Sequence, residues 1–458
     1  RADMKDKKFA DFFKGNFEDI NIVQTFTARY NPRVFTWLNN TFTYASNYTF
    51  NNNIQQKTTG RSARVTSTRS ADFVFQWKKL VASLFGDKKK KSTPGRRRRG
   101  SRRPGQEPDE KGGVNKLSLF QKKKDKRGGI SVNPIKAIRT FFSSFKDINF
   151  NYTERRNITH LGLDAGKPSL AFQFGLSDTT GVGTVPDLAS NDISFTDSKT
   201  YNVGSGVALG RAVDIGLRFQ HSDQRSETTT ITGSSSNTWL RLGKFDMPFP
   251  EWNVRVTGLQ KLPMFSKLFN SVSFSHSFNG QKDVTWNGTP DNEIQVNFIT
   301  NFRPLGKLDL NFKNGFTGSV QVNRSQSLSR SLNVGIGARR TTKSDLSITA
   351  NYSKRSGFRI PFWPFNKAEL KNSIDFSFTF TASKDVVEQR RTQLSGEEKF
   401  EEQDRTTRVS FSPRLTYSFS NRVRGGAFIE FGTTNSKRVG KTSIQEFGID
   451  INISIRGN

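Results

Sequence analysis

The chain has 458 residues, a net charge of +32, 33% hydrophobic residues and no cysteine. The lack of cysteine excludes disulfides and thiolate metal sites. Three widely separated histidines argue against a histidine-based metal site or catalytic triad. No segment approaches the roughly 20 apolar residues of a membrane-spanning helix, so any crossing of a bilayer must use strands.

The first residue is Arg1 and the opening segment has no signal-peptide pattern of a basic region, an apolar region and a cleavage site. We therefore expect the chain to be the C-terminal part of a longer protein.

Residues 1–76 are expected to form strands. Apolar side chains alternate with polar ones from Ile20 to Tyr30 and again from Phe42 to Phe50, and Asn31-Pro32 provides a turn between the two runs.

Residues 77–147 are expected to be an insert. A helix is expected over Asp72–Phe85, because the apolar residues of this segment have helical spacing. A second short helix is expected over Pro134–Phe145. Between them, Lys88–Arg103 carries ten positive charges in sixteen residues. We interpret this run as a solvated, disordered loop that lies on the periplasmic side or touches anionic lipid headgroups. Nucleic-acid binding is the alternative, but no aromatic residues are interleaved with the charges.

From Ile148 to residue 458 the apolar residues recur with a period of two, which predicts strands with one apolar face. In Ile374–Ala382 every second residue is apolar, including Phe376, Phe378 and Phe380, and the intervening residues are Asp, Ser or Thr. Similar runs occur at Val203–Leu209, Val272–Phe278, Ile294–Phe298, Leu308–Phe312, Leu332–Ala338, Leu346–Tyr352, Val409–Phe419 and Phe447–Ile455. From Ile294 onward the runs begin about 12 to 14 residues apart in the densest part, which fits roughly 10 membrane-crossing residues and a short turn.

Two interpretations of these apolar stripes are open. One is the core of a soluble β-sandwich. The other is an antiparallel, transmembrane β-barrel of about 14 to 18 strands with short helical insertions, whose outer face contacts lipid and whose inner face is wet. The second is favoured, because sandwich cores favour Val, Ile and Leu, whereas this chain has 42 phenylalanines and only 33% hydrophobic residues overall. It predicts lipid contact for Phe376, Phe378, Phe380, Ile449, Ile451 and Ile453.

Two segments combine aromatic residues with proline, Pro248–Phe269 and Pro361–Phe365. Tryptophan concentrates at membrane interfaces, so Trp252 and Trp363 are expected to be interfacial and both segments to be interfacial turns. A short helical turn is expected over Met264–Phe269.

No enzymatic site is predicted. Gly440-Lys-Thr442 resembles the end of a phosphate-binding loop, but Asn435 occupies the position where that loop needs glycine. No catalytic residue, cofactor site or metal site is expected.

Several segments resemble the SprA/Sov family, the outer-membrane translocon of the type IX secretion system of Bacteroidota. They are Pro250–Pro263, Phe265–Phe269, Ser271–Phe278, Arg303–Gly315, Arg324–Ser329, Glu369–Phe376 and Thr442–Arg456. The similarity extends from about Asn21 to Asn458 and is weakest over the basic insert, which departs from the family.

The resemblance implies a very large barrel in the cell outer membrane of a Gram-negative bacterium of the Bacteroidota type. It would pass folded proteins, gliding adhesins among them, from the periplasm to the cell surface. The expected partners are secreted substrates, a periplasmic cap, a protein covering a lateral opening, and outer-membrane lipid, with no nucleic acid. This chain would supply less than half of the strands. Alternatives are another large outer-membrane porin or transporter, or a soluble, basic all-β protein that binds nucleic acid or other polyanions.

Overall fold

The structure is a computed structural model that describes residues 2–3, 18–52, 61–85, 142–164, 166–185, 193–243, 245–332, 337–355, 358–359, 369–390, 400–420 and 422–454. The basic run Lys88–Arg103, Trp363 and residues 134–141 of the second predicted helix lie outside the described residues.

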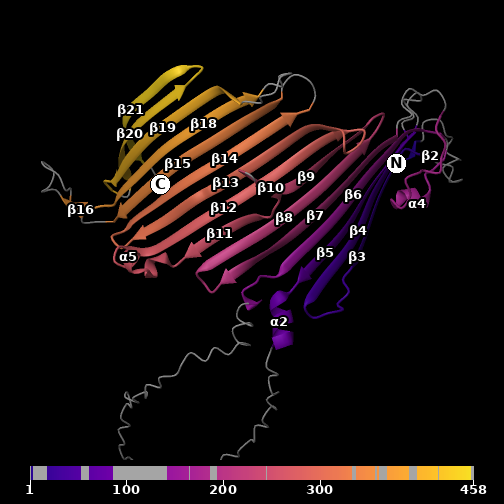
Figure 1. Ribbon diagram of the computed structural model, residues 1–458, viewed down its shortest axis with the longest axis horizontal. Helices are drawn as coiled ribbons and strands as arrows, with labels where there is room; N and C mark the ends of the chain where they lie inside the picture. Colours follow the sequence, from indigo (N-terminus) through magenta and orange to yellow (C-terminus); the bar gives the residue numbers. More distant parts are fainter. Residues whose placement is uncertain are drawn as a thin grey trace, which may run out of the picture.

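Within these residues, one large sheet of 17 strands dominates the fold (Figure 1). Its strands are β3 (Asn21–Tyr30), β4 (Leu38–Asn52), β5 (Arg61–Phe75), β6 (Ile148–Leu163), β7 (Ile193–Leu209), β8 (Val213–Glu227), β9 (Ile231–Leu242), β10 (Phe245–Pro248), β11 (Glu251–Thr257), β12 (Phe269–Asn287), β13 (Glu293–Phe312), β14 (Phe316–Ser331), β15 (Ala338–Lys354), β18 (Ile374–Arg390), β19 (Glu401–Ser418), β20 (Val423–Ser436) and β21 (Gly440–Ile453). The all-β, antiparallel, barrel-type fold predicted from the period of two is confirmed.

Short elements complete the described chain. They are the two-residue strand pairs β1 (Ala2–Asp3) with β2 (Glu18–Asp19) and β16 (Phe358–Arg359) with β17 (Glu369–Leu370), the helices α2 (Trp77–Phe85), α4 (Leu170–Gln173) and α5 (Pro263–Ser266), and the 3₁₀ turn η1 (Leu259–Lys261). None of the helices in the described part of the chain has the length and apolarity needed to span a bilayer.

Most neighbours in the sheet are also neighbours in sequence, and all pair antiparallel. The exception is a seam between β8 and β12. The upper halves of these strands pair with β9, at His221–Glu227 and Gln281–Asn287, and their lower halves pair with β11. β9 and β11 therefore share one position in the wall, end to end, and the four strands form a closed ring of pairings.

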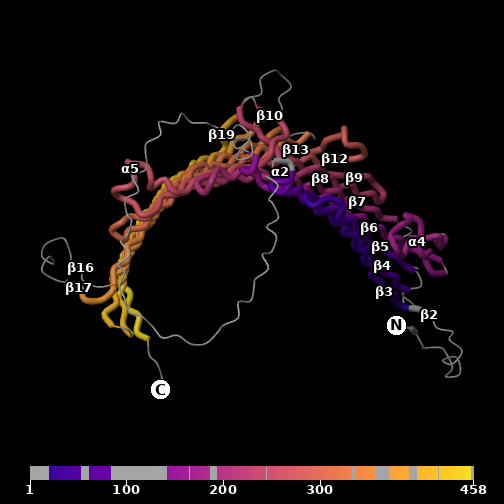
Figure 2. Tube along the Cα trace, turned by 90° about the horizontal axis from the view of Figure 1, so that it is seen from below, coloured from indigo at the N-terminus to yellow at the C-terminus, as the bar shows by residue number. Residues whose placement is uncertain are grey.

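The sheet curves into a barrel-like arch (Figure 2). β3 and β21 lie at its two ends, and in the described residues β3 is registered only with β4 and β21 only with β20. Both strands are exposed along nearly their whole length.

The strands are longer than the sequence interpretation predicted. Ile294–Phe298 and Leu308–Phe312 were expected to be separate strands, but both belong to the 20-residue β13. Pro304, within β13, is preceded by a cis peptide bond, and the register with β14 shifts between Phe302 and Gly306. The alternation of apolar and polar residues is interrupted at this point. The ladder pairing continues on both sides of the interruption, so β13 remains one strand.

The predicted helix at Asp72 begins too early. Asp72 and Phe73 belong to β5, where they pair with Asn151 and Phe150, and the helix α2 starts at Trp77. β5 and β6 pair directly, although the insert separates them in sequence.

A single layer of strands makes up the main sheet (Figure 2). In the described residues no second sheet stacks on it, since the remaining strands are two-residue pairs. The soluble sandwich interpretation, which requires aromatic rings enclosed between two layers, is therefore wrong for this part of the chain.

A candidate membrane-spanning surface and its polar inner wall

The ladder registers assign every strand residue to one of two faces, because directly paired residues in an antiparallel sheet project to the same side. Phe376 pairs with Tyr352 on β15 and Leu415 on β19, Leu415 pairs with Ala427, and Ala427 pairs with Ile449. The six residues predicted to contact lipid, Phe376, Phe378, Phe380, Ile449, Ile451 and Ile453, therefore share one face across four strands.

This apolar face is the convex, outer face of the arch. The successive registers from β4 through β8 and β11 to β15 and β18 place Tyr48 on the same face as Phe380. The ring of Phe172 in α4 packs against Tyr48 with centroids 6.2 Å apart. Figure 2 shows α4 on the outside of the arch. The lipid contact itself stays a prediction, but the placement of the six residues agrees with it.

An apolar belt follows the outer face from strand to strand. Its outward positions carry apolar residues, glycine or proline in Ile374–Ala382, Val409–Tyr417, Val423–Phe431 and Phe447–Ile453. The longer of these runs have nine residues, or about 30 Å of strand, which at a tilt of roughly 45° gives a height of about 21 Å. That value approaches the apolar band of about 25 Å on outer-membrane barrels.

The belt side chains are not covered by protein. Phe447, Ile449, Ile451 and Ile453 on β21 are between 61% and 70% exposed, and Ile429 on β20 is 49% exposed. Isolated exposed apolar residues are normal, but a contiguous surface of this extent indicates an apolar partner.

Trp252 lies on the outer face of β11, opposite Leu217 and Phe278. Its indole stacks on the ring of Phe278, with centroids 4.2 Å apart and planes at 26°, and Phe302 packs against both rings. The expectation that Trp252 occupies a turn is wrong, because Glu251–Thr257 pairs on both sides and is a strand. The short helix predicted after it exists as α5, one residue earlier than expected.

Most inward positions of the strands are polar, with exceptions such as Phe428 on β20 and Ile299 on β13. Between the outward phenylalanines of β18 stand Asp375, Ser377, Thr379 and Thr381, and Thr381 is hydrogen-bonded across the ladder to Ser410 at 2.6 Å. Ser319 and Thr349 are bonded in the same way at 2.8 Å. These hydroxyl and amide groups satisfy one another and present short side chains, which suits a wall in contact with water.

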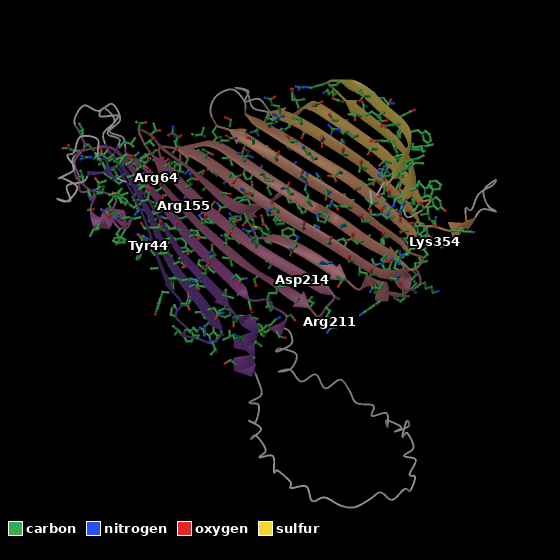
Figure 3. The ribbon with its side chains drawn as sticks, turned by 180° about the vertical axis from the view of Figure 1, so that it is seen from behind. Tyr44, Arg64, Arg155, Arg211, Asp214 and Lys354 are labelled. Carbon is green, nitrogen blue, oxygen red and sulfur yellow. The ribbon has the colours of Figure 1, made fainter. Side chains whose placement is uncertain are left out.

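Arginines add positive charge to the concave face near the other end of the arch. Figure 3 shows Arg64 and Arg155 on the neighbouring strands β5 and β6. The Arg64 guanidinium donates to the side-chain amide oxygen of Asn157 at 2.8 Å, and the Thr66 hydroxyl donates to the same oxygen at 3.0 Å.

At the seam the concave face is hollowed into a groove of about 840 Å³. Glycines on β7 and β8 form part of its floor, and a Cβ atom added at Gly216 would lie 2.2 Å from the Asn253 amide oxygen. The Gly216 N–H donates to that oxygen at 2.8 Å. Glycine at this position therefore allows β11 to join the wall beside β8.

Sequence reasoning missed two features of the outer face. Residues 166–185 fold back over the upper end of β4 to β6, where Phe172 is fully buried with Tyr48, Phe50 and Ile158. The carbonyl oxygen of Asp178 in this segment lies 2.9 Å from His160 Nε2. The second missed feature is a group of arginine and lysine side chains around Phe298. Neither could be found from the period of two, because both depend on contacts between distant strands.

No group of histidine, aspartate and glutamate residues suited to a metal ion occurs among the residues that the structure describes. The segment with the phosphate-loop resemblance, Gly440-Lys-Thr442, starts β21 after a turn from β20.

Comparison with known proteins places the chain in no known family. No family model matches it, and no curated protein matches it by sequence. Among solved structures it is similar to the ferric yersiniabactin uptake receptor FyuA from Yersinia pestis, with 7% identity and a TM-score of 0.27. The match covers 95% of this chain and 65% of that chain. A TM-score this low carries no functional information about the chain.

Proposed function

We propose that the chain forms part of the wall of a wide outer-membrane channel that passes folded proteins from the periplasm to the cell surface. One observation carries the proposal: a single curved layer of strands is apolar and exposed on its convex face and polar on its concave face. This polarity is the inverse of a soluble protein, and it suits lipid outside and water inside.

The size of the arch supports a wide lumen. Barrels of 8 strands are filled by their own side chains, whereas 16 to 18 strands leave an aqueous channel. Here the 17 strands of the main sheet form an arch whose end strands β3 and β21 lie far apart (Figure 2). The short serine, threonine and asparagine side chains of the concave face would leave the lumen open.

The end strands require partners. In hydrocarbon an unpaired backbone N–H or C=O group costs several kcal/mol, so open sheet edges do not face lipid. β3 and β21 each have one registered neighbour within the described residues. A membrane-embedded wall of this shape therefore needs further strands at both edges, which agrees with the expectation that the chain belongs to a larger barrel.

The specific assignment is the type IX secretion translocon of the SprA/Sov family, in a Bacteroidota-type outer membrane. It rests on the resemblance of the segments around Pro250–Pro263 and Thr442–Arg456. Under it the partners are secreted proteins, a periplasmic cap and a lateral-gate protein, the barrel itself performs no catalysis, and gating comes from the partners.

The test uses the full-length protein in its own host. Deletion should abolish release of the secreted proteins, and the wild-type protein should restore it from the outer-membrane fraction. Phe376→Arg/Phe378→Arg should prevent assembly into that fraction, whereas Ser377→Arg/Thr379→Arg on the concave face of the same strand should still assemble.

Two outcomes would contradict the proposal. Outer-membrane fractionation with unchanged secretion would favour another porin or transporter. A chain that stays in solution without detergent, and binds polyanions with a steep salt dependence, would be the soluble binding protein.

A further inference from the structure

The outer face carries a cluster of three cations, Arg241, Lys282 and Arg330, beside the seam in the wall. We propose that this cluster binds the phosphate of a membrane-lipid headgroup. The inference rests on the proposed function, because it requires the outer face of the arch to be in a bilayer.

The three cations converge on one aromatic ring. The guanidinium carbon of Arg241 lies 4.3 Å from the centroid of Phe298, that of Arg330 lies 5.6 Å from it, and Lys282 Nζ lies 5.8 Å from it. Lys282 Nζ also lies 4.8 Å from the Trp239 ring. They come from three strands, β9, β12 and β14, and the registers place all of them on the outer face with the buried Phe298.

The cluster has an excess of positive charge. A guanidinium nitrogen of Arg241 lies 3.9 Å from a carboxylate oxygen of Asp246. In the described part of the chain, no carboxylate oxygen lies within 4.0 Å of the charged nitrogens of Lys282 or Arg330. Asp246 is also engaged by the Trp239 indole, which donates to it at 2.5 Å. The Arg241 nitrogen nearest to Asp246, Nη1, is enclosed and makes no hydrogen bond with the described residues, so the two are held only as a distant ion pair. Three cations and one carboxylate leave a net charge of about +2 held close together without a counterion, which an anionic group would stabilise.

The height of the cluster matches a headgroup. On β12 the outward residues follow the order Phe278, Gly280, Lys282, and Phe278 is the ring on which Trp252 stacks. Lys282 is therefore about 13 Å along a tilted strand from this aromatic stack, and less than that in height. Aromatic residues mark the membrane interface, so the cations lie at the level of the phosphates just beyond it.

The chemistry of the cluster selects phosphate. Guanidinium groups bind phosphate oxygens with paired N–H donors, and an ammonium group adds a point charge. Basic pockets at this depth in membrane proteins bind lipid headgroups. β10, which Figure 2 shows on the outer side of the arch, supplies Asp246 opposite Arg241 at the end of β9, and this pair forms one side of the site.

The test measures lipid binding to the purified full chain in detergent by native mass spectrometry. The probe is a diphosphorylated lipid A, compared with the same lipid after removal of its phosphates, and with inorganic phosphate as a competitor. Lys282→Gln/Arg330→Gln should bind the phosphorylated lipid about 25-fold more weakly, since each cation near an anionic lipid surface contributes about fivefold. The matched control Arg339→Gln/Lys343→Gln removes the same charge from the concave face of β15 and should bind normally. Lys282→Arg/Arg330→Lys, which keeps both charges, should retain most of the affinity.

Equal weakening by both glutamine pairs would show a non-specific effect of net charge and would overturn the site. So would equal binding of the two lipids, or displacement of the lipid by millimolar inorganic phosphate. If the wild-type chain needs no detergent to remain in solution, the proposed function fails and the site fails with it. A detergent-dependent chain without selective lipid binding overturns the site alone.

Discussion

Ile449→Arg tests whether the outer face contacts lipid. Ile449 is 70% exposed on β21 and lies in the middle of the apolar belt, beside Ala427. In water, an exposed substitution of this kind changes the free energy of unfolding by less than about 0.5 kcal/mol. At the midplane of a bilayer an outward arginine costs about 2–4 kcal/mol. The two environments therefore predict effects that differ several-fold at one position.

The assay is guanidinium unfolding of the full-length protein refolded into phosphatidylcholine vesicles, followed by tryptophan fluorescence. Ile449→Arg should lower the free energy of unfolding by about 3 kcal/mol. The control is Thr416→Arg on the concave face, where the paired residues are Asp375 and Gly426, and it should change stability by less than about 0.5 kcal/mol. An Ile449→Arg effect as small as that of the control would refute a lipid-facing outer surface. A larger effect for Thr416→Arg would reverse the two faces.

Three further predictions concern packing of the wall. Phe172→Ala should lower the free energy of unfolding by about 3–5 kcal/mol, because the ring is fully buried. Hydrogen exchange should show opening confined to residues 166–185. Faster exchange throughout the sheet would contradict a local role. Gly280→Val should destabilise the sheet by about 1–3 kcal/mol, because a Cβ there would lie 2.1 Å from the Trp239 carbonyl oxygen. Gly204→Ala, whose nearest contact would be 4.0 Å away, is its control, and equal losses for both glycines in urea unfolding would refute the explanation. Arg340 donates to the Glu388 carboxylate through two nitrogens at 2.6 and 2.8 Å. A double-mutant cycle with Arg340→Gln and Glu388→Gln should therefore give a coupling free energy of about 1 kcal/mol. Additive effects of the two substitutions would show that the pair contributes nothing to stability.

The alternation of residues was sufficient to predict the all-β fold and the two faces of strands such as β18 and β21, although β11 was expected to be a turn. Successive side chains of a strand point to opposite faces. The alternation from Phe376 to Phe380 therefore puts the phenylalanines on one face and the polar residues between them on the other. The prediction that Ile449, Ile451 and Ile453 contact lipid followed from the same pattern; the registers place them on one face with Phe376, and the lipid contact stays a prediction.

The pattern could not predict which strands meet. Glu251–Thr257 is short and rich in aromatic and proline neighbours, so it resembled a turn, and only its pairing with both β8 and β12 makes it part of the wall. The cations around Phe298 come from strands far apart in sequence, and no local signal links Arg241 to Arg330. Strand length was also underestimated, because polar outward residues such as Glu154 and Arg156 on β6 continue the ladder beyond the apolar belt.

Because β9 and β11 lie end to end, the strand register in the upper part of the wall does not depend on the register in the lower part. A residue inserted in β9 would shift side chains only against the upper parts of β8 and β12, and the contacts of β11 below would keep their alignment. Substitutions that adapt the rim at one end of the wall would thus leave the opposite rim unaltered, which is not possible where one uninterrupted strand reaches both rims.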